Sequence, residues 1–255
     1  MSPVHGRLYL VPNTLDFGAP GAVPDLQDVL PLGVIRIAAR LENWVAENAR
    51  TTRAFLKRVD AVQPLARPLQ GITINELPRP QKGGPRAAPA RLDTLLAPAL
   101  QGVDVGLISE AGLPAVADPG AALVQCAHEL GLRVVALPGP SSLLLALAAS
   151  GLNGQSFAFV GYLPVDPGER GARIRELEAL SRRLAQTQLM IETPYRNAAL
   201  MSALLMHLQP ATRVSVSCGL TLPDGFNRTD TVAAWRAGPV ELPSDVPVVF
   251  SLLAS

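Results

Sequence analysis

The chain has 255 residues, of which 48% are hydrophobic, and its formal net charge is +1. This length and apolar content suffice for one large or two small packed domains, and the near-neutral charge gives no global argument for nucleic acid or an anionic membrane. The longest apolar run, residues 143–149, is too short to span a bilayer. Residues 1–6 carry no secretory signal, so we expect a soluble cytoplasmic protein. Cys126 and Cys218 match no zinc or redox spacing and are expected to be buried thiols.

Strand and helix signals alternate over the first half of the chain. Strands are expected at 7–11, 34–38, 44–47, 72–75, 103–108 and 133–137. Helices are expected at 25–30, 51–59 behind an Asn48 cap, 92–100, and from an Asp118–Pro119 cap to Leu130. Two loops rich in Pro and Gly cover 12–21 and 78–89, and the second is expected to be exposed and mobile. This alternation predicts parallel βαβ units.

The second half has a different order of elements. Its helices are expected at 143–149, 169–185 and 195–208, the last behind a Thr193–Pro194 cap. Its strands are expected at 157–161, 189–192, 214–218, 229–235 and 246–252. Consecutive strands near the end predict a mixed, partly antiparallel sheet. The chain is therefore predicted to form two α/β domains, residues 1–138 with a mostly parallel sheet and 139–255 with a mixed sheet.

The most informative stretch is 107–142, where two apolar strands each lead into a loop of Gly, Pro and Ser. Ligands bind at such loops in α/β proteins because the carboxyl ends of parallel strands meet there. Residues 110–112 are either a plain strand-to-helix turn or a backbone cradle for a carboxylate or hydroxyls. The Pro-Gly-Pro-Ser-Ser turn at 138–142 likewise either caps the next helix or lends that helix terminus to a ligand.

Several other functions have little support. No G-x-G-x-x-G follows the first strand and no G-x-x-x-x-G-K-[ST] occurs, which disfavours NAD and ATP. His5, His128 and His207 stand apart from one another and from acidic pairs, so no metal site is expected. Ser141 and Ser142 lack a G-x-S-x-G elbow, which disfavours a hydrolase.

An ordered set of motifs resembles the tetrapyrrole methylase family, the class III S-adenosylmethionine-dependent methyltransferases. The principal matches are S-E-A-G-L-P-A-V-A-D-P-G at 109–120 and L-P-G-P-S-S at 137–142. Further matches in the family's order are L-Y-L-V-P at 8–12, E-N-A-R-T-T-R-A-F-L at 47–56, S-G-L at 150–152, F-V-G-Y-L-P at 159–164 and E-T-P-Y-R at 192–196. Within the family the likeness is greatest to the branch that methylates ribosomal RNA.

The resemblance implies two α/β domains with S-adenosylmethionine in the cleft between them, usually in a homodimer. The positions that match cofactor-binding ones in the family are Pro12, Glu110, Ala111, Gly112, Leu113, Pro114, Ser141, Ser142, Leu163, Pro194, Gly219 and Leu220. Glu47 and Glu110 are candidates for a catalytic base or a positioning group. Arg50, Arg53 and Arg196 are candidate contacts to an anionic acceptor, although solvated helix charges are an equally good interpretation.

Departures from the RNA-methylating pattern leave the acceptor open. The first loop reads V-P-N-T-L-D-F-G at 11–18 instead of an A-T-P-I-G-N-L pattern, and Glu110 replaces an Asp. No dense Lys/Arg run follows Leu163. Three hypotheses follow: methylation of ribosomal RNA, on a ribose 2′-oxygen; methylation of a small molecule such as a tetrapyrrole; and a non-catalytic cofactor-binding module.

Overall fold

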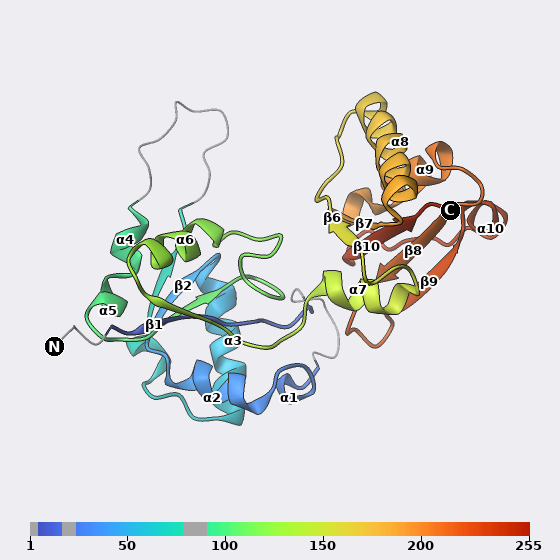
Figure 1. Cartoon of the computed structure of the whole chain (residues 1–255). Helices are drawn as coiled ribbons and strands as arrows, with labels where there is room; N and C mark the ends of the chain where they lie inside the picture. Colours follow the sequence, from blue (N-terminus) through green and yellow to red (C-terminus); the bar gives the residue numbers. More distant parts are fainter. Residues whose placement is uncertain (1–4, 17–23, 79–90) are drawn as a thin grey trace. The chain divides into compact units, whose positions relative to one another are not determined.

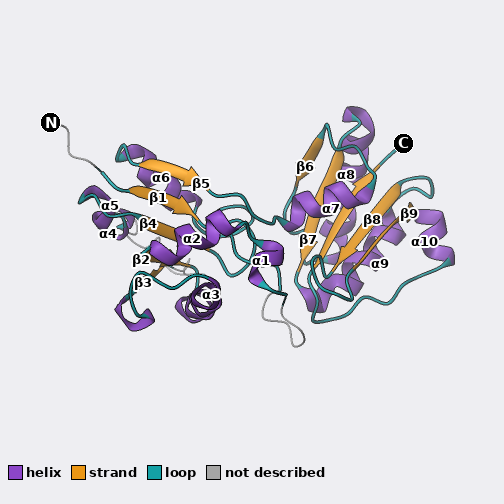
Figure 2. Cartoon of the chain, turned by 90° about the horizontal axis from the view of Figure 1, so that it is seen from below, coloured by secondary structure: helices purple, strands orange, loops and turns teal. Residues whose placement is uncertain are grey.

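The computed structural model describes residues 5–16, 24–78 and 91–255. The chain divides into two compact units, Met1–Pro140 and Ser141–Ser255. Each unit contains one five-stranded sheet with helices packed on it (Figures 1 and 2). The predicted α/β class is therefore confirmed. The loop predicted at 78–89 lies, apart from Pro78, outside the described residues.

The first unit is built on a fully parallel sheet with strand order β3-β2-β4-β1-β5. Its strands are β1 (Arg7–Leu10), β2 (Asn43–Ala46), β3 (Thr73–Glu76), β4 (Val105–Ile108) and β5 (Arg133–Ala136). β4 is buried along its whole length, as a strand covered by helices on both faces should be.

Helices cover both faces of this sheet, and successive strand residues pack on opposite sides. On one face lie α1 (Leu26–Val29), α2 (Leu32–Arg40) and α3 (Ala49–Val62), in a core with Tyr9, Trp44 and Ile108. On the other lie α4 (Leu92–Leu95), α5 (Ala97–Leu100) and α6 (Ala121–Glu129), in a core with Leu8, Val45 and Leu107. Figure 1 shows α4 and α6 on one side of the sheet and α2 on the other.

This arrangement creates a topological switch point between β1 and β4. The chain leaves β1 for β2, on the far side of β4, through α1 and α2 on one face. It leaves β4 for β5, on the far side of β1, through α6 on the opposite face. The connections diverge there, so the loops after β1 and β4 border the place where open α/β sheets bind ligands.

The strand predicted at 34–38 is wrong, because these residues lie in α2. The buried side chains of this helix are Val34, Ile35, Ala38 and Ala39, a spacing that places them on one helical face. A short apolar run fits a buried strand and a buried helical turn equally well. The packing of these residues against α3 favours the helical conformation over a strand.

Two other helix predictions in this unit need correction. Asp118 and Pro119 do not cap α6, because its N-cap is Gly120, with φ of 129° and no side-chain cap bond. The helix predicted at 92–100 is interrupted at Leu96, which separates α4 from α5. Asn48 does cap α3 as predicted, accepting a hydrogen bond from the N–H of Arg50.

The second unit has a mixed sheet with strand order β6-β7-β10-β8-β9, in which only β6 and β7 are parallel (Figure 2). Its strands are β6 (Phe157–Phe159), β7 (Thr187–Glu192), β8 (Arg213–Cys218), β9 (Phe226–Thr231) and β10 (Val248–Leu253). The mixed sheet confirms the prediction for this half.

One helix, α7 (Ser142–Ser150), packs on Leu189 and Val249 at one face of this sheet. The opposite face carries a larger core formed with α8 (Pro167–Leu184) and α9 (Asn197–His207), and the short η2 (Pro194–Arg196) precedes α9. The strand predicted at 229–235 is correct only up to Thr231. Thr231 caps α10 (Val232–Ala237), whose buried Val232 and Trp235 are one helical turn apart.

The cysteine prediction is half correct. Cys218 is buried, whereas Cys126 on α6 is only partly buried, and both are free thiols. Burial is the main reason why the pKa of each thiol is raised above its ordinary value. Among the described residues, no helix is long and apolar enough to cross a membrane.

Candidate functional site

The loops that follow β1, β4 and β5 lie together at the carboxyl edge of the first sheet. Two backbone hydrogen bonds join the first two loops: the Asn13 N–H donates to the Gly112 carbonyl at 2.9 Å, and the Gly112 N–H to the Asn13 carbonyl at 3.2 Å. The structure therefore brings the predicted site residues at 110–114 against the loop that contains Pro12.

Gly112 is at a position where a side chain would be strained. Its φ is 66°, and an added Cβ would lie 3.3 Å from Leu15 Cδ2 and 3.6 Å from the carbonyl oxygen of Pro140. Glycine adopts this left-handed conformation without steric cost. The same contacts show that the loop after β5, which ends at Pro140, also reaches the 109–114 turn.

Gly139 makes the closest approach between loops in this edge. A Cβ there would lie 2.3 Å from Cβ and 2.4 Å from Cγ of Pro12, distances that real atoms do not tolerate. The Pro-Gly-Pro turn after β5 and the first loop are thus in van der Waals contact through the one residue type that permits it.

Unused backbone donors remain in the 109–114 turn. Among the described residues, none accepts a hydrogen bond from the N–H of Ala111 or Leu113. Ala115 and Ala117 follow with φ of 66° and 62°, which alanine rarely adopts. Free donors beside strained backbone favour the cradle interpretation of this turn over the plain turn.

Three carboxyl groups lie around the same turn. The N–H of Glu110 donates to Glu47 Oε2 at 3.1 Å, and Asn48 Nδ2 donates to Glu110 Oε1 at 2.9 Å. Burial, together with the charges of Glu47 and Glu110, raises the pKa of Asp118 from 3.8 to about 6, although a hydrogen bond with Ser109 opposes the shift. The edge is therefore acidic, and one of its carboxyls takes up a proton near pH 6.

The three predicted acceptor-binding arginines have different surroundings. Arg50 and Arg53 are exposed on α3, and Arg53 Nη1 contacts only the Ala49 carbonyl, at 3.4 Å, among the described residues. Arg196, in the second unit, is 2.9 Å from the buried carboxylate of Glu192. Arg196 is thus already engaged in an ion pair, whereas Arg50 and Arg53 are accessible to an anion, and the acceptor contact of all three stays a prediction.

The remaining predicted cofactor residues belong to the second unit. Ser141 is the buried N-cap of α7 without a side-chain cap bond, and Ser142 begins that helix. The Leu163 side chain is buried in the α8–α9 core, so only its backbone is available to a ligand. Pro194 opens η2 after β7, Gly219 has φ of 60° after β8, and Leu220 packs near α7. Their part in ligand binding stays a prediction.

Three residues of this edge were not predicted from the sequence: Asn13, Arg58 and Asp118. Asn13 lies in the loop after β1, and Asp118 lies in the loop between β4 and α6. Polar residues in such loops are often functional, so this position could have identified both as candidates. No local signal marks Arg58, whose contacts are at least 34 residues away in sequence. Among the described residues, no group of three His, Cys, Asp or Glu side chains is arranged so that it could hold a metal ion.

Comparison with known proteins gives the family. The model of the tetrapyrrole (corrin/porphyrin) methylases matches residues 27–233. Among curated proteins, the chain is 40% identical over 140 residues to ribosomal RNA small subunit methyltransferase I of Mesorhizobium japonicum, covering 55% of this chain and 46% of the relative. It is 30% identical over 191 residues to the protein of that name from Streptococcus pyogenes serotype M6, covering 75% and 57%. The chain thus spans about half the length of the curated relatives it matches.

Solved structures agree on the fold. Uroporphyrin-III-C-methyltransferase from Thermus thermophilus is similar with a TM-score of 0.52 and 21% identity, covering 97% of this chain and 92% of that one. The methyltransferase CobJ is similar with a TM-score of 0.57 and 16% identity, covering 98% and 95%. At these identities the likeness concerns the fold alone.

Proposed function

The chain belongs to the tetrapyrrole (corrin/porphyrin) methylase family, and from this premise we propose that it is an S-adenosylmethionine-dependent methyltransferase. The observation that carries the proposal is the meeting of the β1, β4 and β5 loops at the switch point of the first sheet. We propose that residues 110–114 contact the methyl donor through their backbone, with Pro12 beside them.

The donor set of this edge suits the polar part of such a ligand. The N–H groups of Ala111 and Leu113, which bond no acceptor in the part of the chain that the structure describes, can donate to a carboxylate or to ribose hydroxyls. Gly112 between them lets the turn adopt φ of 66° and pack against Leu15 and Pro140, because it has no side chain. A backbone cradle of this kind binds by shape and needs no particular side chain.

The charge of the edge also supports this ligand. A sulfonium and an α-amino group are cationic, and Glu47, Glu110 and Asp118 would attract them. The same carboxylates would repel the phosphates of ATP or NAD. The electrostatics therefore agree with the absence of phosphate-binding motifs from the sequence.

The chemistry required of the chain is modest. The bound methyl donor supplies an already activated carbon, so alignment of the acceptor and exclusion of water provide much of the rate. A poor nucleophile such as a ribose hydroxyl also needs a proton acceptor. Glu47 and Glu110 are proposed for that part, and Glu110 is better placed for contact with an acceptor because its side chain is exposed.

We propose ribosomal RNA as the acceptor, because the curated relatives carry that name and because Arg50 and Arg53 are accessible on α3. A small molecule such as a tetrapyrrole is the second candidate, favoured by the near-neutral net charge. A non-catalytic cofactor-binding module is the third. We further propose a cytoplasmic homodimer, which sedimentation equilibrium of the purified chain would test.

Calorimetric titration with S-adenosylmethionine and with its demethylated product tests the donor site. One site per chain is expected. Gly112→Ala should weaken binding about tenfold, since alanine at φ of 66° is strained and the new methyl contacts Leu15. Gly131→Ala is the matched control, with φ of 69° but open space around it at the end of α6, and should bind like the wild type. No heat at millimolar ligand would refute the donor assignment.

Transfer of a tritiated methyl group separates the acceptors. Ribosomal RNA fragments and small-molecule extracts are incubated with the protein and labelled donor. Label found only in RNA supports the first acceptor and rejects the second, whereas label found only in small molecules does the reverse. Binding of the donor without any labelled product would favour the non-catalytic module.

A further inference from the structure

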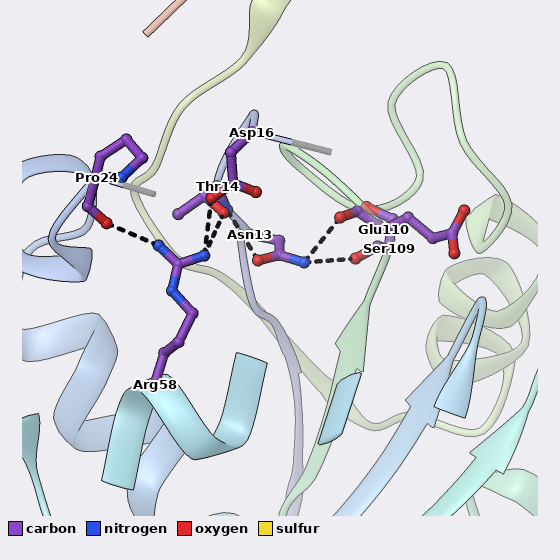
Figure 3. Close-up of polar contacts among 7 residues, drawn as sticks. All are labelled: Asn13, Thr14, Asp16, Pro24, Arg58, Ser109 and Glu110. Atoms are coloured by element: carbon purple, nitrogen blue, oxygen red, sulfur yellow. Dashed lines mark hydrogen bonds and ion pairs between the residues drawn. The ribbon is translucent and has the colours of Figure 1, made fainter. Parts of the chain in front are cut away.

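A buried polar cluster lies beneath the candidate site, and the proposed chemistry does not use it. Its members are Asn13, Thr14, Asp16 and Ser109, each less than 9% exposed. Buried polar groups cost stability unless they are hydrogen-bonded. Arg58 on α3 is a cation that bonds two of these four residues, Thr14 and Asp16 (Figure 3).

Arg58 holds the first loop at two places. Its Nη1 donates to Asp16 Oδ2 at 2.8 Å and to Thr14 Oγ1 at 3.1 Å, while its Nη2 donates to the carbonyl of Pro24 at 3.0 Å. Asp16 and Pro24 stand on either side of residues 17–23. A single planar guanidinium thus ties Thr14, Asp16 and Pro24 to α3, which lysine could not do with the same geometry.

Asn13 connects that loop to the turn after β4. Its Nδ2 donates to the carbonyl of Glu110 at 2.9 Å and to that of Ser109 at 3.3 Å. Its Oδ1 accepts from the N–H of Thr14 at 2.9 Å, which fixes the orientation of the amide. The Asn13 side chain and backbone together therefore hold the turn by its carbonyls and at Gly112.

The same helix also reaches the turn from its other end. Asn48, the N-cap of α3, donates to the Glu110 carboxylate. Arg58 lies ten residues further along, about 15 Å up the helix axis. α3 is a helix of 14 residues, and it therefore fixes the distance between the Glu110 turn and the Thr14–Asp16 segment to which it is hydrogen-bonded.

We propose that Arg58 is a positioning residue for the methyl donor, acting through Thr14 and Asn13 on the 109–112 turn. This inference rests on the proposed function. Ordering the turn before the ligand arrives removes an entropic cost of binding, so loss of Arg58 should weaken donor binding without altering the chemical step. In kinetic terms, KM for the donor rises and kcat at saturating donor stays the same.

The test compares two ion pairs of the first unit, Arg58–Asp16 and Arg40–Asp104. Arg58→Met keeps the aliphatic stem and removes the donors, and Arg58→Lys restores charge but not the fork. Arg40→Met is the matched control, because Arg40 pairs with Asp104 at 2.7 Å near the amino ends of the strands, away from the site. Thr14→Val, nearly isosteric, serves as a second variant if Arg58→Met does not fold.

Hydrogen exchange of the ligand-free proteins provides the first measurement. The Gly112 amide, bonded to Asn13, should exchange about tenfold faster in Arg58→Met and at the wild-type rate in Arg40→Met. Titration with the demethylated donor provides the second: about tenfold weaker binding in Arg58→Met, an intermediate value in Arg58→Lys, and no change in Arg40→Met.

The outcomes separate the two proposals. Suppose that the wild-type protein binds the donor, and that a folded Arg58→Met or Thr14→Val variant has the same affinity and the same amide exchange rate. This result overturns the positioning role and leaves the proposed function standing. A wild-type protein that binds no donor refutes the proposed function, and with it the ligand assigned to Arg58. A fall in kcat at saturating donor, with KM unchanged, would also contradict the positioning role.

Discussion

The contact between Gly139 and Pro12 makes a sharp prediction about how the site is assembled. In Gly139→Ala, the new Cβ would have to move from 2.3 Å to an ordinary contact of at least 3.4 Å from Pro12 Cβ. The atoms it meets belong to a rigid proline ring, so the loops after β1 and β5 must separate by about 1 Å. Overpacking of this size costs about 2 kcal/mol and should lower the unfolding temperature of the first unit by about 6 °C.

Tryptophan fluorescence can follow this unit alone. The chain has two tryptophans, Trp44 buried in the first unit and Trp235 buried in the second. In a Trp235→Phe background, thermal unfolding reported by Trp44 should show the shift. The control is Gly33→Ala on α2, where nothing lies within 4 Å of the added methyl and a gain of about 0.5 kcal/mol is expected.

The two alanine variants should therefore change stability in opposite directions. If Gly139→Ala unfolds at the temperature of its parent, or above it, the close approach of the two loops is not a feature of the folded protein. The geometry on which the candidate site depends would then be refuted.

Three further predictions concern charge and capping. The raised pKa of Asp118 means that the folded state binds its proton more tightly than the unfolded state, so the free energy of unfolding should fall as pH rises from about 4 to 6. In urea titrations, Asp118→Asn should flatten this dependence on pH. An unchanged slope would show that Asp118 does not cause it. If RNA is the acceptor, Arg50→Ala and Arg53→Ala should each reduce the salt slope of RNA binding by about 1 in filter-binding assays, whereas Arg36→Ala, also exposed, should not. Asn48→Ala should destabilise the first unit by about 1 kcal/mol in urea denaturation, and equal stability would contradict its capping role.

Local patterns were sufficient to identify most strands. β4 is a mostly apolar run, and β8 alternates Val with Ser, which is the period of a strand, so the positions of both follow from local pattern. The pattern failed where two structures share it. The short run at 34–38 suits a strand as well as a helical turn, and Thr231 both ends β9 and caps α10. Only packing against neighbouring elements separates these alternatives.

The candidate site divides in the same way. The turn at 109–114 was expected from glycine and proline after an apolar strand, because those residue types are needed locally wherever a chain turns sharply. Asp118 was expected to be a helix cap, since Asp followed by Pro is typical of one, yet it lies near Glu47 and Glu110 instead. Its raised pKa depends on neighbours that are distant in sequence.

The sequence by itself determined the α/β class, the family and the loops that are rich in glycine and proline, since each of these depends on residues close together in the chain. The tertiary structure alone decided that Pro12 meets Gly139, that Asn13 holds the turn at Gly112, and that Arg58 reaches Asp16 across 42 positions. Such contacts depend on strand order and on which face each helix covers, and long-range packing, not local propensity, sets both.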